Sequence, residues 1–375
     1  MAAPATADAW RERARAVATT VVRPLVPAMD RDDRMPATIV ESLRAGGFFG
    51  LGIPRDWGGG GGDARSIAGV LEELATESAA VATLLSVHLS VAAAPILQWG
   101  NDAQRERYLR PLAEGRWLGA FGLTEPSVGS DTARLATRYA RAEDGFLLTG
   151  SKMFITNAAS ADLLLVFATR EPSAGHRGIS AFLLARGTPG FTIAQRLDKL
   201  GLRGSETNEL VLDGARLPID AMLGPEGDGL KVALGALTGG RVGIAACALG
   251  VARAAFEEMQ RRARLAPDDA KRALMAEAYV DLAAARALVA DAAARKDSGL
   301  EYVDAASAAK LYASQAAVRI ASKGVDVAGW EGVSSGATPE RLLRDARVFP
   351  IVEGTTEIQE LILGRALIGR SSIAT

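Results

Sequence analysis

The chain has 375 residues, of which 49% are hydrophobic and 23% are charged. This composition is typical of a globular protein that buries one large core or a few smaller ones. Its 43 basic and 44 acidic residues leave a net charge of −1, and only 5% of residues are aromatic. The chain therefore lacks the electrostatic and base-stacking signatures of a nucleic acid partner.

Cysteine and histidine are scarce. Cys247 is the only cysteine, and His88 and His176 are the only histidines, so neither a disulfide framework nor a His/Cys metal cluster can be built. Cys247 lies in a run of small apolar residues, which favours a buried hydrophobic role. His88 lies in an apolar helix, where a hydrogen-bonded core histidine is favoured over a catalytic one. His176 lies in a Gly-His-Arg-Gly loop and is expected to be exposed.

The N-terminal stretch has no charged region leading into a long apolar segment. No run along the chain is expected to reach the length of a membrane span. We therefore expect a cytoplasmic protein without a membrane span.

Residues 1–115 are predicted to form an N-terminal α-helical domain. From Trp10 to about Glu114 the apolar residues recur at three- and four-residue spacing, the pattern of amphipathic helices, and the glycine run 58–62 predicts a loop. The apolar positions that show this spacing most clearly are Ile39, Leu43, Phe48, Ile67, Val70, Leu71 and Leu74.

Residues 116–225 are predicted to form a middle β domain, a barrel or sandwich of about a hundred residues. Near Trp117 the hydrophobic period becomes strand-like, with Gly, Pro and Asp turns between the segments. The predicted strands cover residues 146–149, 163–167, 179–184 and 209–212.

Residues 226–375 are predicted to form a C-terminal four-helix bundle. The helical period returns after 225–229, and long Ala-rich stretches place apolar residues on one face, as at Leu274, Ala278, Leu282, Ala285 and Val289. The whole chain is thus predicted to be an α+β multidomain protein.

Glu353 is the first candidate for chemistry. It stands in the segment 351–359, Ile-Val-Glu-Gly-Thr-Thr-Glu-Ile-Gln, where an apolar stretch precedes it and a glycine turn and a predicted amphipathic helix follow. Burial raises the pKa of a carboxyl group toward neutrality, where it becomes an effective base. The same segment could instead be a simple helix start, with Thr355 and Glu357 satisfying free backbone amides.

Three segments of the predicted β domain offer groups for a polar, flat ligand. Segment 121–131 reads Phe-Gly-Leu-Thr-Glu-Pro-Ser-Val-Gly-Ser-Asp and suits a phosphate or a polar ring edge. Segment 150–158 adds Phe154, which could lie against a ring, and Thr156 two residues on, on the same face of a strand. The third segment, 201–207, reads Gly-Leu-Arg-Gly-Ser-Glu-Thr.

These segments, in this order and followed by Glu-Gly-Thr-x-Glu-Ile-Gln, resemble the acyl-CoA dehydrogenase family of flavoproteins over nearly the whole chain. The resemblance implies FAD bound between the β domain and the C-terminal bundle. Phe121, Leu123 and Thr124 would surround the isoalloxazine, and Gly129 and Ser130 would face pyrophosphate or the substrate's pantetheine. Phe154 and Thr156 would flank the ring, with Phe154 where the family usually has tryptophan, and Thr355 and Glu357 would approach another part of the flavin.

The resemblance also implies the reaction, which is α,β-desaturation of an acyl-CoA or acyl-carrier thioester. Glu353 would remove the α-proton while hydride passes from the β-carbon to flavin N5, and the thioester oxygen would bind the base's own N–H and a ribityl hydroxyl. Arg241 matches an arginine near this carboxylate, and Ser130, Val352, Gly354 and Arg241 would contact substrate. Some relatives carry the base just before that arginine, where this chain has Gly240.

The chain departs from the family pattern at surfaces that would face a neighbouring subunit. An Arg-x-x-Phe-Gly loop that would reach a neighbour's FAD is missing between Arg264 and Met275, and the connection is shorter by about two helical turns. The family's Gln-x-x-Gly-Gly appears as Asp326-Val-Ala-Gly-Trp330. Val352 stands where tyrosine is common. These departures leave open a hetero-oligomer whose partner supplies the loop and a homo-oligomer that holds FAD more weakly.

Two alternatives from other classes remain at this point. One is a flavin-poor structural subunit of a heteromeric enzyme, and the other is a flavin oxidase or monooxygenase on the same scaffold. For the leading interpretation, electron-transferring flavoprotein or a similar protein is the expected electron acceptor.

Overall fold

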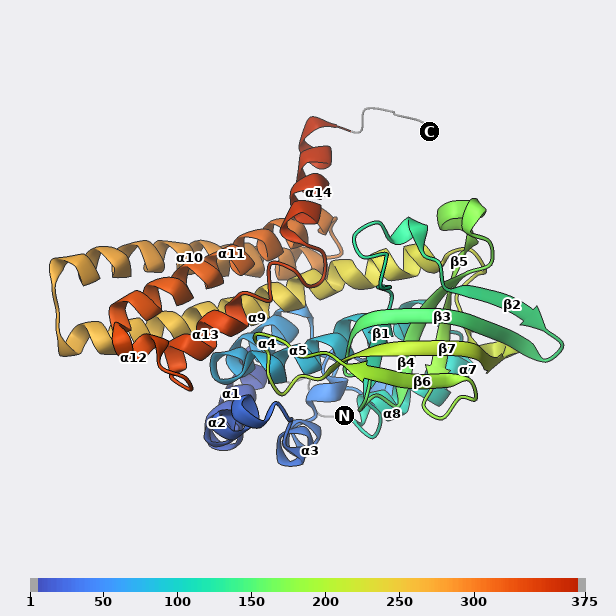
Figure 1. Cartoon of the computed structure of the whole chain (residues 1–375), viewed down its shortest axis with the longest axis horizontal. Helices are drawn as coiled ribbons and strands as arrows, with labels where there is room; N and C mark the ends of the chain where they lie inside the picture. The colour runs from blue at the N-terminus through green and yellow to red at the C-terminus, as the bar shows by residue number, and fades with distance from the viewer. Residues whose placement is uncertain (1–5, 370–375) are drawn as a thin grey trace.

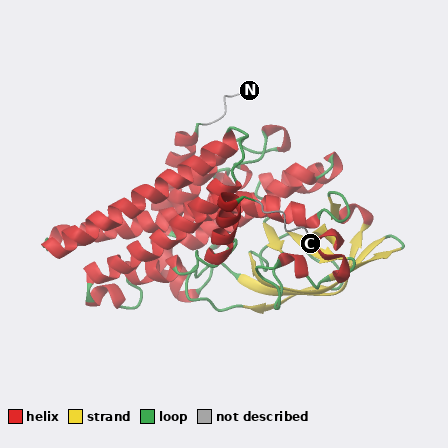
Figure 2. Ribbon diagram, turned by 90° about the horizontal axis from the view of Figure 1, so that it is seen from above, coloured by secondary structure: helices red, strands yellow, loops and turns green. Residues whose placement is uncertain are grey.

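The computed structural model describes residues 6–369 as a helical N-terminal part, a β-sheet, and long C-terminal helices (Figure 1). The sheet lies at one end of the molecule and the long helices extend away from it, with the N-terminal helices packed along one side (Figure 2). This is the architecture expected from the sequence, since the helical and strand-like periods change near Trp117 and again after residue 225.

Short helices make up the N-terminal part, and several continue into one another through π-helical turns. The loop predicted at glycines 58–62 separates η3 from α4. The elements are α1 Ala7–Val17, η1 Ala18–Val22, α2 Arg23–Asp32, α3 Ala37–Ala45, η2 Phe48–Gly50, η3 Arg55–Trp57, α4 Ala64–Glu77, α5 Ala79–Val87, η4 His88–Ala93, α6 Ala94–Trp99, α7 Asp102–Gln104, η5 Arg105–Leu109 and α8 Arg110–Ala113.

The middle part is one eight-stranded sheet in the order β6-β7-β3-β2-β4-β5-β8, with β1 paired to β4. The four predicted strands correspond to β3, β4, β5 and β7. The strands β1, β2, β6 and β8 were missed because each contains only two or three apolar residues. The elements are β1 Gly119–Gly122, η6 Thr132–Arg134, β2 Arg138–Ala142, β3 Gly145–Thr156, β4 Leu163–Thr169, η7 Pro172–Gly178, β5 Ile179–Ala185, β6 Phe191–Arg196, β7 Thr207–Pro218, η8 Ile219–Ala221 and β8 Met222–Leu223.

Three long helices dominate the C-terminal part, and α13 packs against two of them, α9 and α11. The predicted apolar face of α10 is buried at Ala278, Leu282, Ala285 and Val289. The elements are α9 Gly229–Leu265, α10 Asp269–Asp297, α11 Val303–Ala328, α12 Trp330–Val333, α13 Thr338–Ala346 and α14 Thr356–Ile368.

Helix α14 differs from its prediction. It projects away from the bundle axis (Figure 1), and Gln359 is its one fully buried residue among those described. It therefore lacks the buried apolar stripe of an amphipathic helix, since Leu361 and Leu367 are exposed.

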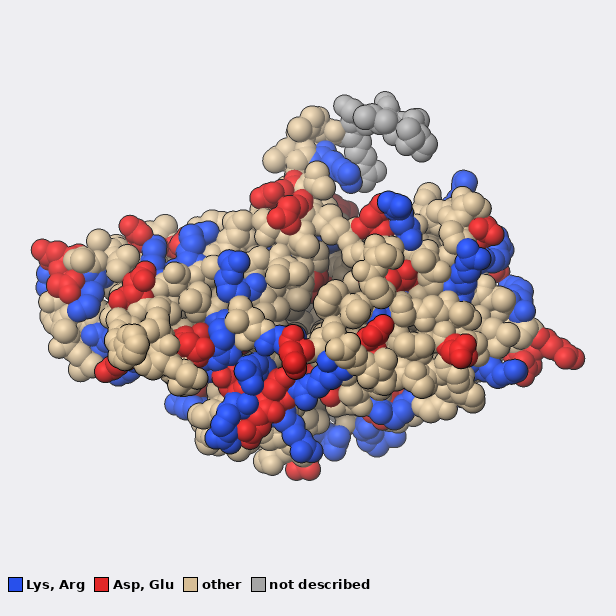
Figure 3. All heavy atoms as spheres, viewed as in Figure 1, with Lys and Arg blue, Asp and Glu red and all other residues tan. Residues whose placement is uncertain are grey.

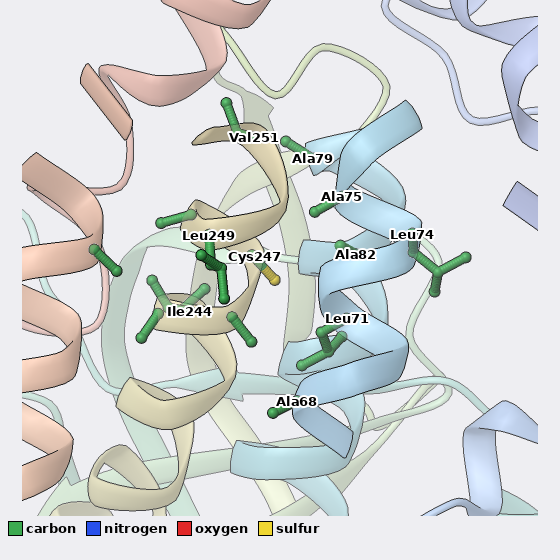
Figure 4. Close-up of a cluster of buried hydrophobic side chains, with 14 of the residues drawn as sticks. Ala68, Leu71, Leu74, Ala75, Ala79, Ala82, Ile244, Cys247, Leu249 and Val251 are labelled. Atoms are coloured by element: carbon green, nitrogen blue, oxygen red, sulfur yellow. The ribbon is translucent and has the colours of Figure 1, made fainter. Parts of the chain in front are cut away.

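Helix α9 passes through the centre of the molecule and joins all parts. Cys247 has no exposed surface and packs among small side chains of α4 and α5 (Figure 4), which confirms its hydrophobic role. On α4, the buried carboxylates of Glu72 and Glu73 form salt bridges with Arg11 of α1 and Arg253 of α9. These charged contacts fix the N-terminal helices against α9.

The two most apolar helical stretches correct one expectation. Ala79–Trp99 and α9 are both long and apolar enough to cross a membrane by length and composition, so the expectation that no segment reaches that length was wrong. In each, 83% of the apolar window is buried inside the protein, as in a core helix.

His88 is a core residue. Its Nδ1 accepts the Gly119 N–H at 3.1 Å and its Nε2 lies 3.2 Å from the Phe49 carbonyl, so a neutral ring satisfies both contacts. Burial lowers its pKa to about 4. The core role is confirmed, and the ring links η4 to β1. His176 is exposed, also as predicted.

Candidate active site

Glu353 lies in the turn between α13 and α14. Its backbone is left-handed, with φ of 56°, and Gly354 follows with φ of 93°. A non-glycine residue in this region costs roughly 1–3 kcal/mol and persists only when the surroundings enforce it. The turn directs the Glu353 side chain inward, while Ile351 beside it is exposed.

The Glu353 carboxyl group lies against α9. A Cβ placed on Gly240 would be 2.9 Å from Glu353 Cδ, so the carboxylate fills the space that this glycine leaves. The Oε2 atom is sealed from solvent and has no hydrogen-bond partner. Desolvation raises the pKa of Glu353 to about 7, and the charges of Arg241 and Lys310 partly oppose this shift. Such a carboxyl group is poised to exchange a proton near neutral pH.

Arg241 is the neighbour of Gly240 on α9 and is 5% exposed. Its Nε has no partner among the described residues. Burial lowers its pKa, and attraction to Glu353 and Tyr302 opposes the shift. The structure thus brings the two predicted catalytic residues together.

Lys310 and Gln359 hold the same turn, and the sequence analysis missed both. Lys310 Nζ donates to the carbonyls of Gly354 at 2.6 Å and Pro350 at 3.2 Å. Gln359 Nε2 donates to the Gly354 carbonyl at 3.0 Å. A signal was available, since Lys310 is a single charge inside an Ala-rich helical stretch.

On the sheet, a buried ion pair fixes the loop that follows β1. Lys152 and Glu125 are 0% and 4% exposed, and their charged atoms are 2.8 Å apart. Lys152 also donates to the Leu123 carbonyl at 3.2 Å, and the Glu125 carboxylate accepts the N–H groups of Ala136 and Thr137. The Met153 N–H donates to the Thr124 carbonyl at 2.8 Å. The sequence did not predict this pair, although Glu125 lies in segment 121–131 and Lys152 in segment 150–158.

The predicted ring-contact residues are placed at the edge of the sheet and the helices. Phe121 is partly buried and packs against Val87 and Val91 of α5 and η4 and Ala236 of α9. Leu123 is buried and Thr124 partly buried, whereas Gly129 and Ser130 lie exposed on the loop.

Phe154 shows a local irregularity of β3. It has φ of 62° and is 65% exposed, and the pairing with β7 shifts register between Lys152 and Ile155. The regular two-residue alternation that was assumed to align Phe154 with Thr156 therefore does not hold at Phe154. Thr156 is partly buried and pairs with Thr207.

Segment 201–207 has a structural role that its sequence did not reveal. Leu202, with φ of 54°, donates its N–H to Asp345 of α13 at 2.7 Å. The Gly204 N–H donates to Asp33 at 2.6 Å. The segment thus ties the sheet to α13 and to the N-terminal helices.

The remaining predicted residues surround the Glu353 turn. Val352 is partly buried against the main core, and Gly354 is needed because a Cβ there would meet Gln359. Thr355 is the N-cap of α14, and the side chain of exposed Glu357 bonds with Thr355, which lowers the Glu357 pKa.

Two described cavities lie elsewhere. One of about 750 Å³ lies between α2, α3 and the sheet, and one of about 970 Å³ lies among α2, α9 and α13; neither is lined by Glu353 or Arg241 among the described residues. Figure 3 shows another hollow between the helical bundle and the sheet, below α14, the helix that follows Glu353. In the described part of the chain, no cluster of three or more acidic, His or Cys side chains could hold a metal ion.

Comparison with known proteins places the whole chain. The N-terminal, middle and C-terminal domain models of acyl-CoA dehydrogenase match residues 4–116, 120–215 and 227–368. The chain belongs to the acyl-CoA dehydrogenase family. An acyl-CoA dehydrogenase of Bacillus subtilis (strain 168) is 41% identical over 96% of this chain and 97% of its own.

Two solved structures share the fold of this acyl-CoA dehydrogenase family member. Butyryl-CoA dehydrogenase from Megasphaera elsdenii superposes with a TM-score of 0.95 at 37% identity, covering 98% of this chain and 100% of its own. A chain from the structure of the electron transferring flavoprotein of Acidaminococcus fermentans gives 0.95 at 35% identity with the same coverage. The chain is therefore an FAD-dependent oxidoreductase that dehydrogenates acyl-CoA.

The residues present fit a flavin between sheet and helices. The exposed ring of Phe154 offers a flat apolar surface that a bound ring would cover. The backbone of Leu123 and Thr124 is fixed by buried contacts, and the Glu353 and Arg241 side chains each keep an unpartnered polar atom. Unpartnered buried polar atoms are uncommon in folded proteins, and a catalytic role is one explanation for them.

Proposed function

We propose that Glu353 is the base of this acyl-CoA dehydrogenase and removes the α-proton of the bound thioester. The observation that carries the proposal is its sealed, unpartnered Oε2 atom on a carboxyl group whose pKa is raised to about 7. A base with this pKa combines a large ionised fraction at neutral pH with real affinity for the proton. The carboxylate has no rival at Gly240, which carries no side chain.

The other groups act on the charge that develops as the proton leaves. Bound FAD would supply the acceptor for the hydride that leaves the β-carbon. The N–H of Glu353 is proposed to donate to the thioester oxygen and stabilise the enolate charge. Arg241 balances the buried negative charge of Glu353 and keeps the base ionised for part of the time at neutral pH.

We propose that the predicted contacts divide between sheet and turn. The sheet side is supported by the fixed backbone at Leu123 and Thr124 and by the exposed Phe154. The proposed FAD contacts are Phe121, Leu123, Thr124, Gly129, Ser130, Phe154, Thr156, Thr355 and Glu357. The proposed substrate contacts are Ser130, Arg241, Val352 and Gly354.

The substrate proposal is an acyl-CoA, with short chains as the first to be tested because a butyryl-CoA dehydrogenase shares the fold at 37% identity. Electron-transferring flavoprotein is the proposed acceptor. We also propose a cytoplasmic location, supported by burial of both apolar helices inside the protein.

Anaerobic flavin reduction tests the proposal. The wild-type holoenzyme is mixed with a panel of acyl-CoA thioesters and the loss of flavin absorbance is followed. Glu353→Gln should lower the reduction rate by at least about 10²-fold while keeping bound flavin. The control is Glu360→Gln, which removes an exposed carboxylate from the N-terminal half of α14. Its flavin should be reduced at the wild-type rate. Normal reduction by Glu353→Gln would overturn the assignment. Rapid peroxide formation in air would indicate an oxidase instead.

A further inference from the structure

Lys310 is a buried lysine to which the proposed reaction gives no role. It lies on α11 with no exposed surface, one of the largest fully buried side chains of the described chain. Its helical neighbours Ala306, Ala309 and Ala313 are also buried. A buried ammonium group carries a large desolvation cost, so its retention needs compensating contacts.

Those contacts bracket Glu353. Lys310 Nζ donates to the Pro350 carbonyl on one side of the base and to the Gly354 carbonyl on the other, at 3.2 and 2.6 Å. The Pro350 carbonyl also accepts the Thr356 N–H at 2.9 Å. Lys310 therefore draws the start of the turn and its end toward one point on α11.

Gln359 closes the turn from α14. Its Nε2 donates to the carbonyls of Gly354 at 3.0 Å and Glu353 at 3.4 Å, and the residue is fully buried. The left-handed backbone of Glu353 is thus enclosed by donors from two helices. A turn held only by its own backbone bonds would be free to relax to a less strained conformation.

We infer that Lys310 is a positioning residue for Glu353, because its ammonium group clamps the carbonyls on both sides of the base and fixes the turn that directs the carboxylate at α9. The inference rests on the proposed function, since it assigns Lys310 to the base identified there. Gln359 assists by holding the Gly354 carbonyl from the other side.

The charge of Lys310 also faces the base. Arg241 of α9 and Lys310 of α11 both lower the Glu353 pKa against the effect of burial. Burial lowers the pKa of Lys310 to about 8, an effect that Glu353 and Glu357 oppose and Arg241 reinforces. The other titratable groups coupled to this cluster are Tyr302, through Arg241, and Cys247, through Glu353. At neutral pH the lysine is mostly charged, so its removal leaves Glu353 with Arg241 as its main cation.

The test compares charge loss with donor loss on the FAD-loaded enzyme. Lys310→Met should lower kcat on the order of 10- to 100-fold, as misplaced catalytic groups do, and should move the acid limb of the kcat profile to higher pH. Gln359→Met removes a donor without changing charge, so it should lower kcat and leave the limb in place. Lys323→Met removes a lysine from the same helix that pairs with Glu277, and should change neither.

A measurement independent of turnover follows the protonated carboxyl stretch of Glu353 by infrared difference spectroscopy, assigned by its loss in Glu353→Gln. This band should titrate at higher pH in Lys310→Met than in the wild type. If Lys310→Met does not fold, Lys310→Arg keeps the charge but not the compact geometry, and should lower kcat with an unshifted limb.

The outcomes separate the two levels of the proposal. Wild-type kcat and an unshifted limb in folded Lys310→Met, with Glu353→Gln inactive, would overturn the positioning role alone. Equal flavin reduction by wild type and Glu353→Gln would overturn the proposed function itself.

Discussion

Gly240 and Glu353 occupy touching positions from opposite sides of the site. A Cβ on Gly240 would lie 2.9 Å from Glu353 Cδ and even closer to Oε2. The Glu353 carboxylate can therefore occupy this position only because Gly240 of α9 has no side chain. The resemblance had indicated that relatives place the base at one or the other of these points, and the structure shows that the two points converge.

Gly240→Ala should impair catalysis while leaving the fold intact. The added methyl group is fixed to the helix backbone, so the Glu353 carboxylate must move. Because a displaced catalytic group can lower a rate by roughly 10²-fold, we expect flavin reduction by acyl-CoA to slow by at least about tenfold. Gly239→Ala is the matched control, because its Cβ would meet only the flexible end of Lys296 at 3.3 Å. As an Ala in a helix, it should stabilise the protein by up to about 1 kcal/mol. Equal rates of flavin reduction in Gly240→Ala and Gly239→Ala would contradict the close contact between Gly240 and the Glu353 carboxyl group.

The rate of flavin reduction should depend on pH through Glu353. The base must be ionised to accept the α-proton, so the rate is expected to rise with pH and level off above about 7, the raised pKa of this carboxyl group. Stopped-flow reduction by one acyl-CoA across the pH range measures this limb. A limb near the ordinary carboxyl value of 4.5 would mean that the carboxylate is solvated rather than sealed.

The titration of Glu353 should also change the free energy of unfolding, which should fall with rising pH while the rate of flavin reduction rises. The folded state holds a proton on Glu353 up to about pH 7, whereas the unfolded chain releases it near the ordinary value of 4.5. The folded state therefore binds more protons between these values, and the free energy of unfolding falls as pH rises across that window. Glu353→Gln removes this contribution, so it should gain stability relative to wild type from pH 5 to pH 8 in urea unfolding. A constant difference between the two proteins would argue against the raised pKa.

The sequence predicted the architecture where a single period dominates. The helices around Leu71 and Leu282 and the strands β3, β4, β5 and β7 repeat apolar residues at helical or strand spacing, which local sequence encodes directly. The short strand β2 and the outward course of α14 were not predicted, because pairing and tertiary packing rather than local pattern decide them. The protruding α14 shows this most clearly, since its sequence is apolar while its surface is exposed.

The candidate site could be predicted only in part. Glu353 was a candidate from its own segment, the family pattern then favoured it as the base and added Arg241, and the structure brings the two residues together. Lys310 and Lys152 were missed because a lysine in a sequence normally indicates exposure. The Ala-rich stretch around Lys310 was a sign of burial, but only the fold shows the carbonyl groups that each lysine contacts. The left-handed backbone at Phe154 was equally invisible, because a bulge depends on the register with β7.

The buried pair Lys152–Glu125 should hold the loop after β1 that is proposed to contact FAD. Lys152→Met leaves the Glu125 carboxylate buried without its cation, which should cost about 3–5 kcal/mol and speed FAD release, since Leu123 and Thr124 lose their anchor. Lys231→Met, which breaks the exposed pair with Asp228, should cost at most about 1 kcal/mol. Urea unfolding measures the loss of stability, and flavin fluorescence after dilution measures the rate of FAD release.

A double variant completes that test. Glu125→Gln in the Lys152→Met background removes the stranded charge. The Ala136 and Thr137 N–H groups bond to separate oxygens of the Glu125 carboxylate, so the single glutamine oxygen can keep only one of these two bonds. Part of the lost stability should therefore return. If the double variant were as unstable as Lys152→Met, the pair would not act through its charges.

The far end of the bundle bears on assembly and on FAD affinity. Only residues 266–268 connect α9 to α10, and Trp330, the first residue of α12, is 85% exposed. The resemblance places an arginine loop and a glycine at these two positions, facing a neighbour's FAD. Losing one charge-assisted phosphate contact should weaken FAD binding by about 1.5–3 kcal/mol, roughly 10- to 150-fold.

We expect this chain purified alone to form an oligomer and to lose FAD on desalting, with less than one flavin per chain by absorbance. Light scattering gives the assembly state, and flavin titration gives the affinity. Co-expression with a second family member that carries the arginine loop should raise occupancy if the pair is heteromeric, and should leave it unchanged if weak binding is a property of a homo-oligomer. Full, stable occupancy in the isolated chain would show that other contacts replace the missing loop.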